Sequence, residues 1–267
     1  MIRNVLSIAG SDPSGGAGIQ ADLKTFSARG AYGMAVLTAL TAQNTQGVTG
    51  VHTVPAAFVA EQIRAVFADV RVDAVKIGMI ANAEIAGAIA DMLRSRHDSL
   101  PIVLDPVMIA KGGSPLLASD AVAAVAHQLM PLAAVVTPNL PEAAALLDEP
   151  VATTREAMAD QARRLQRIGP KAVLVKGGHL ESEDSPDVLA DVAGIHWFEG
   201  KRAPTRNTHG TGCTLSSAIA AELAKGAAPA DAVAIAKAYL AGAIAAADEL
   251  SVGTGHGPVQ HFHEWWR

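Results

Sequence analysis

Short apolar runs alternate with longer amphipathic segments along almost the whole chain, and this alternation limits the possible folds more than any other feature. The apolar runs are continuous, as in strands that are covered on both faces. We expect strands at 5–9, 34–41, 74–77, 102–104, 134–137 and 172–176. We expect helices at 19–29, 58–68, 83–94, 119–130, 141–147, 154–168, 214–224 and 229–250, and a hairpin within 188–204. The order predicts an α/β fold with a mostly parallel central sheet and helices on both faces.

Length, composition and charge narrow the class of protein. The 267 residues fit one domain over 1–267, and the apolar half of the chain can build a sizeable core. A net charge of −5 without blocks of like charge argues against nucleic acid or anionic membranes as partners. The single cysteine excludes an internal disulfide. The apolar run at 5–9 is too short for a signal peptide, and the run at 232–247 is shorter than the roughly 20 residues of a membrane span, so we expect a cytoplasmic protein.

Special residues follow several of the predicted strands. Ligands of parallel sheets bind beyond the carboxyl ends of the strands, so residues at these ends are expected to form one site. They are Gly10, Ser11, Asp12, Gln43, Asn44, Gly78, Met79, Asp105, Pro106, Asn139, Lys176, Gly177 and Gly178.

The segment NTHGTGCT at 207–214 precedes a predicted helix. Gly210 and Gly212 allow a tight turn that directs backbone N–H groups to one point, and the helix N-terminus adds partial positive charge. Such a turn suits a phosphate or the charge that develops on a moving phosphoryl group. Cys213 lies at its mouth, where we expect a thiol pKa below the usual value of about 8.5. The alternatives are an ordinary capped turn and a small buried apolar cysteine.

The glycine-rich segment GSDPSGGAG at 10–18 permits close approach of a ligand to the backbone, but it matches neither the dinucleotide fingerprint nor a P-loop. Asp22, expected in the first turn of the next helix, could equally complement the helix dipole. Asp105 offers the oxygen ligands that Mg²⁺ prefers, although an Asp-Pro pair is also a common turn.

Two further strand ends carry candidate nucleotide-binding groups. Asn139 could cap the following helix, and Glu142 could reach a metal ion through water. Lys176 could bind a phosphate as a point charge. The alternative interpretation is that it is an ordinary surface lysine.

Taken together, these segments resemble the hydroxymethylpyrimidine/phosphomethylpyrimidine kinases, the thiamine-pathway branch of the ribokinase-like family. The combination is far more specific than any one segment, and it runs almost from end to end. The matching segments are IAGSDPSGGAGIQAD at 8–22, AQNT at 42–45, KIGM at 76–79, LDPVM at 104–108, TPNLPEA at 137–143, VKGGH at 175–179, NTHGTGCT at 207–214 and GPV at 257–259.

The resemblance implies a single ribokinase-like domain, a homodimer, and the transfer of phosphoryl groups from ATP with Mg²⁺. The substrates would be 4-amino-5-hydroxymethyl-2-methylpyrimidine and then its monophosphate. It implies that Gln43 contacts the edge of the pyrimidine, because an amide offers both a donor and an acceptor. It places Gln43, Gly10, Asp22, Met79, Val107 and His209 at the substrate, Lys176, Asn139 and Thr208 at the nucleotide, Asp105 and Glu142 at the metal, and Gly210, Thr211, Gly212 and Cys213 at the catalytic centre.

Most sugar kinases of this family place aspartate where Cys213 stands, so the resemblance implies that Cys213 is the base. Phosphoryl transfer depends mainly on positioning and charge stabilisation, so the anion hole is expected to matter even where a strong base does not. Three other functions stay open: a pyridoxal or pyridoxine kinase, a cysteine-nucleophile enzyme that pairs Cys213 with His209, and a non-catalytic ligand-binding relative.

Two peripheral segments complete the prediction. The loop at 110–115 contains Gly112 and Gly113 and is expected to act as a lid. The tail at 256–266 is rich in histidine and aromatic residues. We expect its tryptophans to dock it on the domain, and we expect no structural zinc there.

Overall fold

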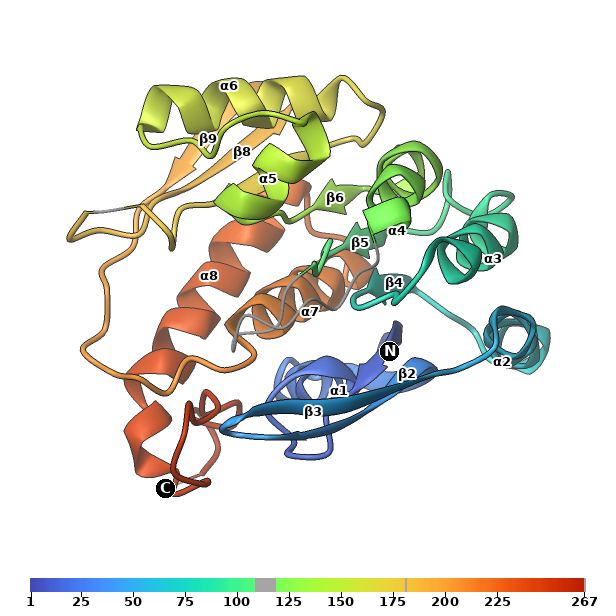
Figure 1. Ribbon diagram of the computed structural model, residues 1–267, viewed down its shortest axis with the longest axis horizontal. Helices are drawn as coiled ribbons and strands as arrows, with labels where there is room; N and C mark the ends of the chain where they lie inside the picture. Colours follow the sequence, from blue (N-terminus) through green and yellow to red (C-terminus); the bar gives the residue numbers. More distant parts are fainter. Residues whose placement is uncertain (109–118, 181, 267) are drawn as a thin grey trace.

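A computed structural model describes residues 1–108, 119–180 and 182–266 of the chain (Figure 1). The predicted lid at 110–115 lies outside the described residues. The described strands form one nine-stranded sheet in the order β3-β2-β1-β4-β5-β6-β7-β8-β9. Its parallel part contains β1 (Asn4–Ser11), β2 (Tyr32–Asn44), β4 (Ala74–Ile77), β5 (Ile102–Leu104), β6 (Val135–Val136) and β7 (Val173–Lys176). Antiparallel strands close both edges: β3 (Gly47–Thr53) on one side, and β8 (Asp187–Asp191) with β9 (Gly194–Phe198) on the other.

Helices cover both faces of this sheet, as predicted. Along β1, Val5 belongs to one hydrophobic core and Leu6 and Ile8 to the other, because successive side chains of a strand point to opposite faces. One core lies beneath α1 (Gly18–Ala28), α7 (Thr211–Ala224) and α8 (Pro229–Ala245). The other lies beneath α2 (Ala56–Asp69), α3 (Ala83–Leu93), α4 (Ser119–Ala124), α5 (Leu140–Leu147) and α6 (Arg155–Gln166).

The structure corrects several predicted boundaries. Strand β3 was not predicted, because its sequence GVTGVHT is largely polar or glycine and most of the strand is exposed. The predicted helix at 119–130 is α-helical only to Ala124 and continues as a wider turn, Val125–Leu129, and a 3-10 turn that contains Pro131. Helix α7 begins at Thr211, three residues earlier than predicted, which brings Cys213 into its first turn.

One described helix, Pro229–Glu249, is long and apolar enough to cross a membrane by length and composition alone. The apolar run at 232–247, on which the expectation of no membrane span rests, is shorter than this helix. Ala232, Val233, Ala236 and Tyr239 of this helix are buried in the core that it shares with α7, and 33% of its most apolar 18-residue stretch is buried.

The C-terminal tail packs on the domain as predicted, but mainly through residues other than its tryptophans. Val259, Gln260 and His261 are buried, and Tyr239 Oη donates to the carbonyl oxygen of His261 over 2.7 Å. Trp265 and Trp266 remain 66% and 57% exposed. Trp265 Nε1 donates to the carbonyl oxygen of Ala28 over 3.4 Å, and Trp266 stacks on Phe262.

Candidate active site

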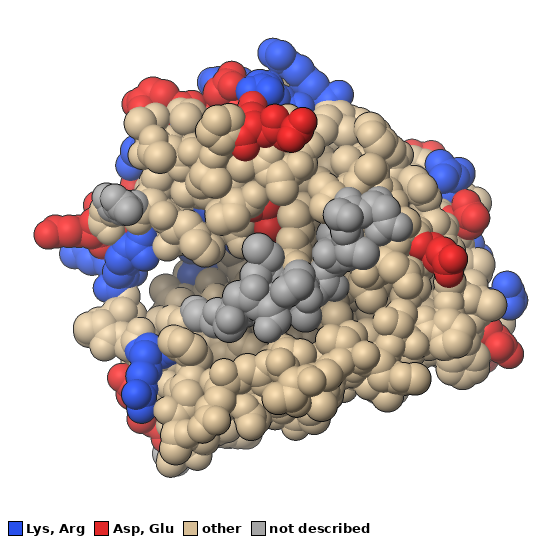
Figure 2. Space-filling model, viewed as in Figure 1, with Lys and Arg blue, Asp and Glu red and all other residues tan. Residues whose placement is uncertain are grey.

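A cavity of about 510 Å³ opens at the carboxyl edge of the parallel strands. Figure 2 shows a hollow on this face, while charged side chains gather mainly around the periphery of the view. Among the strand-end residues, Asn44, Gly78, Pro106, Gly177 and Gly178 do not line this cavity. All the proposed site residues except Asp22 do. They are Gly10, Gln43, Met79, Asp105, Val107, Asn139, Glu142, Lys176, Thr208, His209, Gly210, Thr211, Gly212 and Cys213.

A second cavity, of about 710 Å³, adjoins the first between β9, the loop that follows it and α8. The two cavities share Asn139, Lys176, His179, Thr208, Thr211 and Gly212 as lining residues. The N-terminus of α7 and the end of β7 therefore stand at the junction of two binding spaces, as a site that joins two ligands requires.

The N-terminus of α7 depends on the backbone of Gly210. This residue has φ 80° and caps the helix, and its carbonyl oxygen accepts a hydrogen bond from Thr214 N over 2.8 Å. A Cβ atom at Gly210 would clash with the carbonyl oxygen of Gly16, so only glycine lets the loop at 10–18 pass this close. The first N–H groups of α7, including those of Gly212 and Cys213, have no acceptor within the helix. Both residues line the cavity at the place where the sequence predicts an anion hole.

The expected low pKa of Cys213 is wrong. The residue keeps some solvent contact, but burial of the thiol raises its pKa to about 11. The Lys76 ammonium opposes this rise, whereas the carboxylates of Asp22 and Asp105 add to it. The loss of hydration around the thiol thus outweighs the favourable field of the helix N-terminus.

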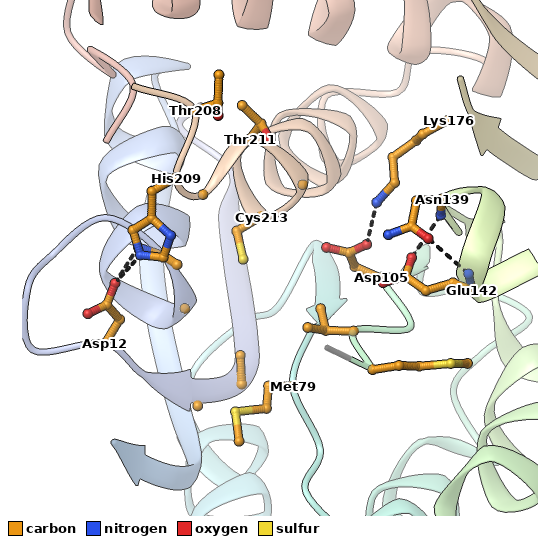
Figure 3. Close-up of a pocket in the computed structure, with 18 of the residues that line it drawn as sticks. Asp12, Met79, Asp105, Asn139, Glu142, Lys176, Thr208, His209, Thr211 and Cys213 are labelled. Carbon is orange, nitrogen blue, oxygen red and sulfur yellow. Dashed lines mark hydrogen bonds and ion pairs between the residues drawn. The ribbon is translucent and has the colours of Figure 1, made fainter. Parts of the chain in front are cut away.

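Lys176 and Asp105 form an ion pair at the junction of the cavities (Figure 3). Lys176 Nζ lies 2.9 Å from Asp105 Oδ1. Burial alone would raise the pKa of Asp105, but Lys176 and Lys76 hold it below the usual value. Asp105 also accepts hydrogen bonds from Thr137 Oγ1 at 3.1 Å and Ser216 Oγ at 3.3 Å. Only 15% of the Lys176 side chain is exposed, so the alternative of an ordinary surface lysine is excluded.

Asn139 caps α5, as one of the two predictions for it proposed. Its Oδ1 accepts from Glu142 N at 2.9 Å, and Glu142 Oε2 accepts from Asn139 N at 2.8 Å, which completes a capping box. Burial raises the pKa of Glu142 to about 7; Lys176 opposes this rise and Asp105 contributes to it.

The donor set around Asp105 and Glu142 fits a divalent cation that arrives with a nucleotide. The described residues hold no group of three or more His, Cys, Asp or Glu side chains suited to a metal ion. Two carboxylates nevertheless face the same cavity and disfavour each other's ionisation, a repulsion that a cation would relieve. Mg²⁺ is usually held by one or two carboxylates together with water and substrate phosphates.

The opposite end of the cavity contains an arrangement that sequence reasoning did not anticipate. His209 Nε2 lies 2.8 Å from Asp12 Oδ2. Burial by itself would raise the pKa of Asp12, but the hydrogen bonds from His209 and Ser14 outweigh burial and hold this pKa below its usual value. An ionised Asp12 can only accept, so His209 Nε2 carries the proton and donates it. The Gln43 amide nitrogen lies 3.3 Å from the same ring atom and cannot donate to it.

Asp22 does not contact the cavity, which corrects the proposed substrate contact. It lies in the second turn of α1, not the first, and is fully buried. Its carboxylate accepts hydrogen bonds from both Ser7 Oγ at 2.6 Å and Ser217 Oγ at 2.7 Å, and it forms an ion pair with Lys76.

Lys76 lines the cavity, although no role is predicted for it from the sequence. The signal that could have revealed it is a lone charge inside the apolar strand AVKI.

Known proteins give an independent comparison. A family model described as phosphomethylpyrimidine kinase matches residues 12–260. A hydroxymethylpyrimidine/phosphomethylpyrimidine kinase of Escherichia coli is 55% identical over 263 residues, covering 98% of each chain.

Two solved structures share the fold. A phosphomethylpyrimidine kinase of Clostridium difficile superposes with a TM-score of 0.79 at 43% identity, over 89% of this chain and 97% of that one. An ADP complex of a Bacillus subtilis pyridoxal kinase superposes with a TM-score of 0.89 at 36% identity, over 98% of both chains.

Proposed function

The chain belongs to the phosphomethylpyrimidine kinase family, and from this premise we propose how its site works. It is an ATP-dependent kinase of thiamine biosynthesis that phosphorylates 4-amino-5-hydroxymethyl-2-methylpyrimidine and then converts the monophosphate to the diphosphate. The observation that carries the proposed mechanism is the junction of the two cavities, where Lys176 and the first turn of α7 face both.

In this mechanism the pyrimidine occupies the smaller cavity and the nucleotide the larger one, with its phosphates at Lys176 and α7. The hydroxyl oxygen of the substrate forms a bond to the γ-phosphorus as the bond to the leaving ADP oxygen breaks. The N–H groups of Gly212 and Cys213 stabilise the charge that spreads over the moving group. Cys213, in its thiolate form, accepts the hydroxyl proton.

Asp105 and Glu142 would hold Mg²⁺, which neutralises phosphate charge when bound. The residues of the chain prepare this region themselves. Lys176 keeps Asp105 ionised, and the capping box with Asn139 fixes the carboxylate of Glu142. Lys176 can exchange its contact with Asp105 for a phosphate oxygen without leaving the cavity.

The Gln43→Leu variant tests the proposed pyrimidine site. We expect KM for hydroxymethylpyrimidine to rise about tenfold to a hundredfold, because a polar edge of the substrate loses its partner, while KM for ATP stays unchanged. Steady-state kinetics with each substrate varied in turn measures both constants. Gln46→Leu is the matched control, because Gln46 lies in the exposed turn between β2 and β3, bonds to Thr254 of the C-terminal segment and does not line the cavity. An equal rise of both constants in Gln43→Leu would place Gln43 outside the pyrimidine site.

Phosphorylation of pyridoxal is a second candidate activity, favoured by the likeness to the Bacillus subtilis pyridoxal kinase. The identity to that chain is 36%, against 55% to the Escherichia coli pyrimidine kinase, so the pyrimidine is the better supported substrate. The non-catalytic alternative is disfavoured because both cavities and the α7 turn are intact.

We also propose a cytoplasmic homodimer. The single cysteine fits a reducing compartment. Leu40, Val51 and Phe58 are 45–53% exposed around β2, β3 and α2, which supports burial of this region by a second copy. Light scattering of the purified protein decides the mass, and a monomer at micromolar concentration would contradict the dimer.

A further inference from the structure

Lys76 is a fully buried charged side chain in the middle of the sheet. It stands in β4 between Val75 and Ile77, and none of its surface is exposed. Its Nζ lies 2.8 and 2.9 Å from the two oxygens of Asp22, which is equally buried. Buried ion pairs are often no more stable than apolar replacements of the same volume, so stability alone does not account for this pair.

The ammonium of Lys76 is directed toward the catalytic cavity. A Cβ atom at Gly78 would lie 2.7 Å from Lys76 Nζ, so the side chain extends toward the carboxyl end of β4. An ammonium has three N–H donors, and Asp22 supplies both of the acceptors found for it among the described residues. One donor is therefore left for the cavity, which Lys76 and Cys213 both line.

Helix α7 connects this pair to Cys213. Ser217 follows Cys213 by four residues, so the two side chains lie on the same face of the helix. Ser217 Oγ donates to Asp22 Oδ1 over 2.7 Å. The face of α7 that carries Cys213 thus rests on the Asp22–Lys76 pair, with the cysteine one turn nearer to the mouth of the cavity.

We infer that Lys76 is a positioning residue that acts through Cys213: its ammonium, held by Asp22, supplies the positive charge beside the thiolate that accepts the hydroxyl proton. The inference rests on the proposed role of Cys213 as base. In the step, the proton passes from the substrate hydroxyl to Cys213 Sγ as the new O–P bond forms. Lys76 stays protonated throughout, and Asp22 balances its charge once the thiol is neutral.

Other groups around Cys213 also affect the stability of its thiolate, so a test must separate their effects from that of Lys76. Asp22 on α1 and Asp105 after β5 both disfavour the thiolate, whereas the backbone N–H of Gly18 favours it. Lys176 on β7 also interacts favourably with the thiolate. Burial raises the pKa of the Cys213 thiol, and Lys76 opposes this rise more strongly than the other groups that favour the thiolate.

The alkylation rate of Cys213 by iodoacetamide tests the inference without any need for turnover. Cys213 is the only cysteine, so each alkylation event reports on this thiol. Below the pKa of the thiol, the rate is proportional to the thiolate fraction. An opposite charge nearby usually lowers a pKa by roughly one unit or more, but a thiolate of higher pKa is also more nucleophilic, so Lys76→Met should slow alkylation about threefold or more. Lys76→Arg keeps the charge and should stay close to the wild-type rate.

The double variant Lys76→Met/Asp22→Asn guards against misfolding, because it leaves no unpaired buried charge. Its alkylation rate should fall between those of Lys76→Met and the wild type, since removal of the Asp22 charge favours the thiolate. Lys237→Met is the matched control: Lys237 forms a similar pair with Asp187, 2.6 Å away, beside the neighbouring cavity, and its loss should not change the rate. A wild-type rate in both Lys76→Met and the double variant would overturn the inference.

The pH profile of kcat/KM separates this inference from the proposed base role. If both hold, Lys76→Met moves the rising limb of the profile to higher pH, in step with the alkylation data. If Lys76→Met slows alkylation but Cys213→Ala turns over normally, the charge effect is real and the base role fails, which overturns the catalytic part of the inference.

Discussion

Replacing Cys213 by alanine should lower kcat by about two to four orders of magnitude, the usual contribution of a general base. KM for ATP should change little, because Lys176 and the backbone N–H groups of α7 remain in place. Steady-state kinetics on the first phosphorylation measures both constants, and circular dichroism checks the fold. Cys213→Ser is the matched control, because a hydroxyl of similar size is too weakly acidic to act as an ionised base.

The wild-type pH profile belongs to the same prediction. The thiol has a pKa raised to about 11, and only the thiolate can accept a proton. Activity should therefore increase with pH above neutrality, with a limb that disappears in Cys213→Ala. If Cys213→Ser or Cys213→Ala kept near-normal turnover, the base role would be excluded, and catalysis would depend on positioning and charge stabilisation.

Gly210→Ala should reduce kcat/KM by about a hundredfold or more, because small displacements of catalytic groups are costly. Gly210 has φ 80°, and a methyl group there would clash with the backbone of Gly16. The substitution therefore either shifts the first turn of α7 or pushes the loop at 10–18 out of the cavity. Kinetics for both substrates and thermal unfolding should be measured together.

Gly226→Ala provides a matched control at the opposite end of the same helix. Gly226 also has a positive φ, of 98°, but a Cβ atom there would meet no described atom within 4 Å. It should lose about 1–2 kcal/mol of stability from the left-handed backbone and retain its kcat/KM. If both variants lost activity in proportion to stability, the close approach of Gly210 to Gly16 would have no specific catalytic role.

Much of the site could be predicted from the sequence because local patterns encode it. Apolar runs marked the parallel strands, and special residues directly after them had to meet at one edge. The same principle explains why Asp105, Asn139 and Lys176, which lie far apart in the chain, line one cavity.

The remaining features depend on contacts between distant segments. Asp22 and Lys76 are 54 residues apart, and neither sequence context reveals the other as a partner. The pKa of Cys213 was predicted in the wrong direction because a helix N-terminus is visible in the sequence, whereas burial is not. The start of α7 was placed too late because threonine and glycine have low helix propensity, and tertiary packing overrides that preference.

The most direct test of the central claim is the product formed by the purified chain from ATP, Mg²⁺ and one acceptor at a time, identified by mass spectrometry. The acceptors are hydroxymethylpyrimidine, its monophosphate and pyridoxal. We predict the pyrimidine monophosphate from the first, the diphosphate from the second, and much slower turnover of the third. Faster turnover of pyridoxal, or no product from either pyrimidine, would contradict the assignment.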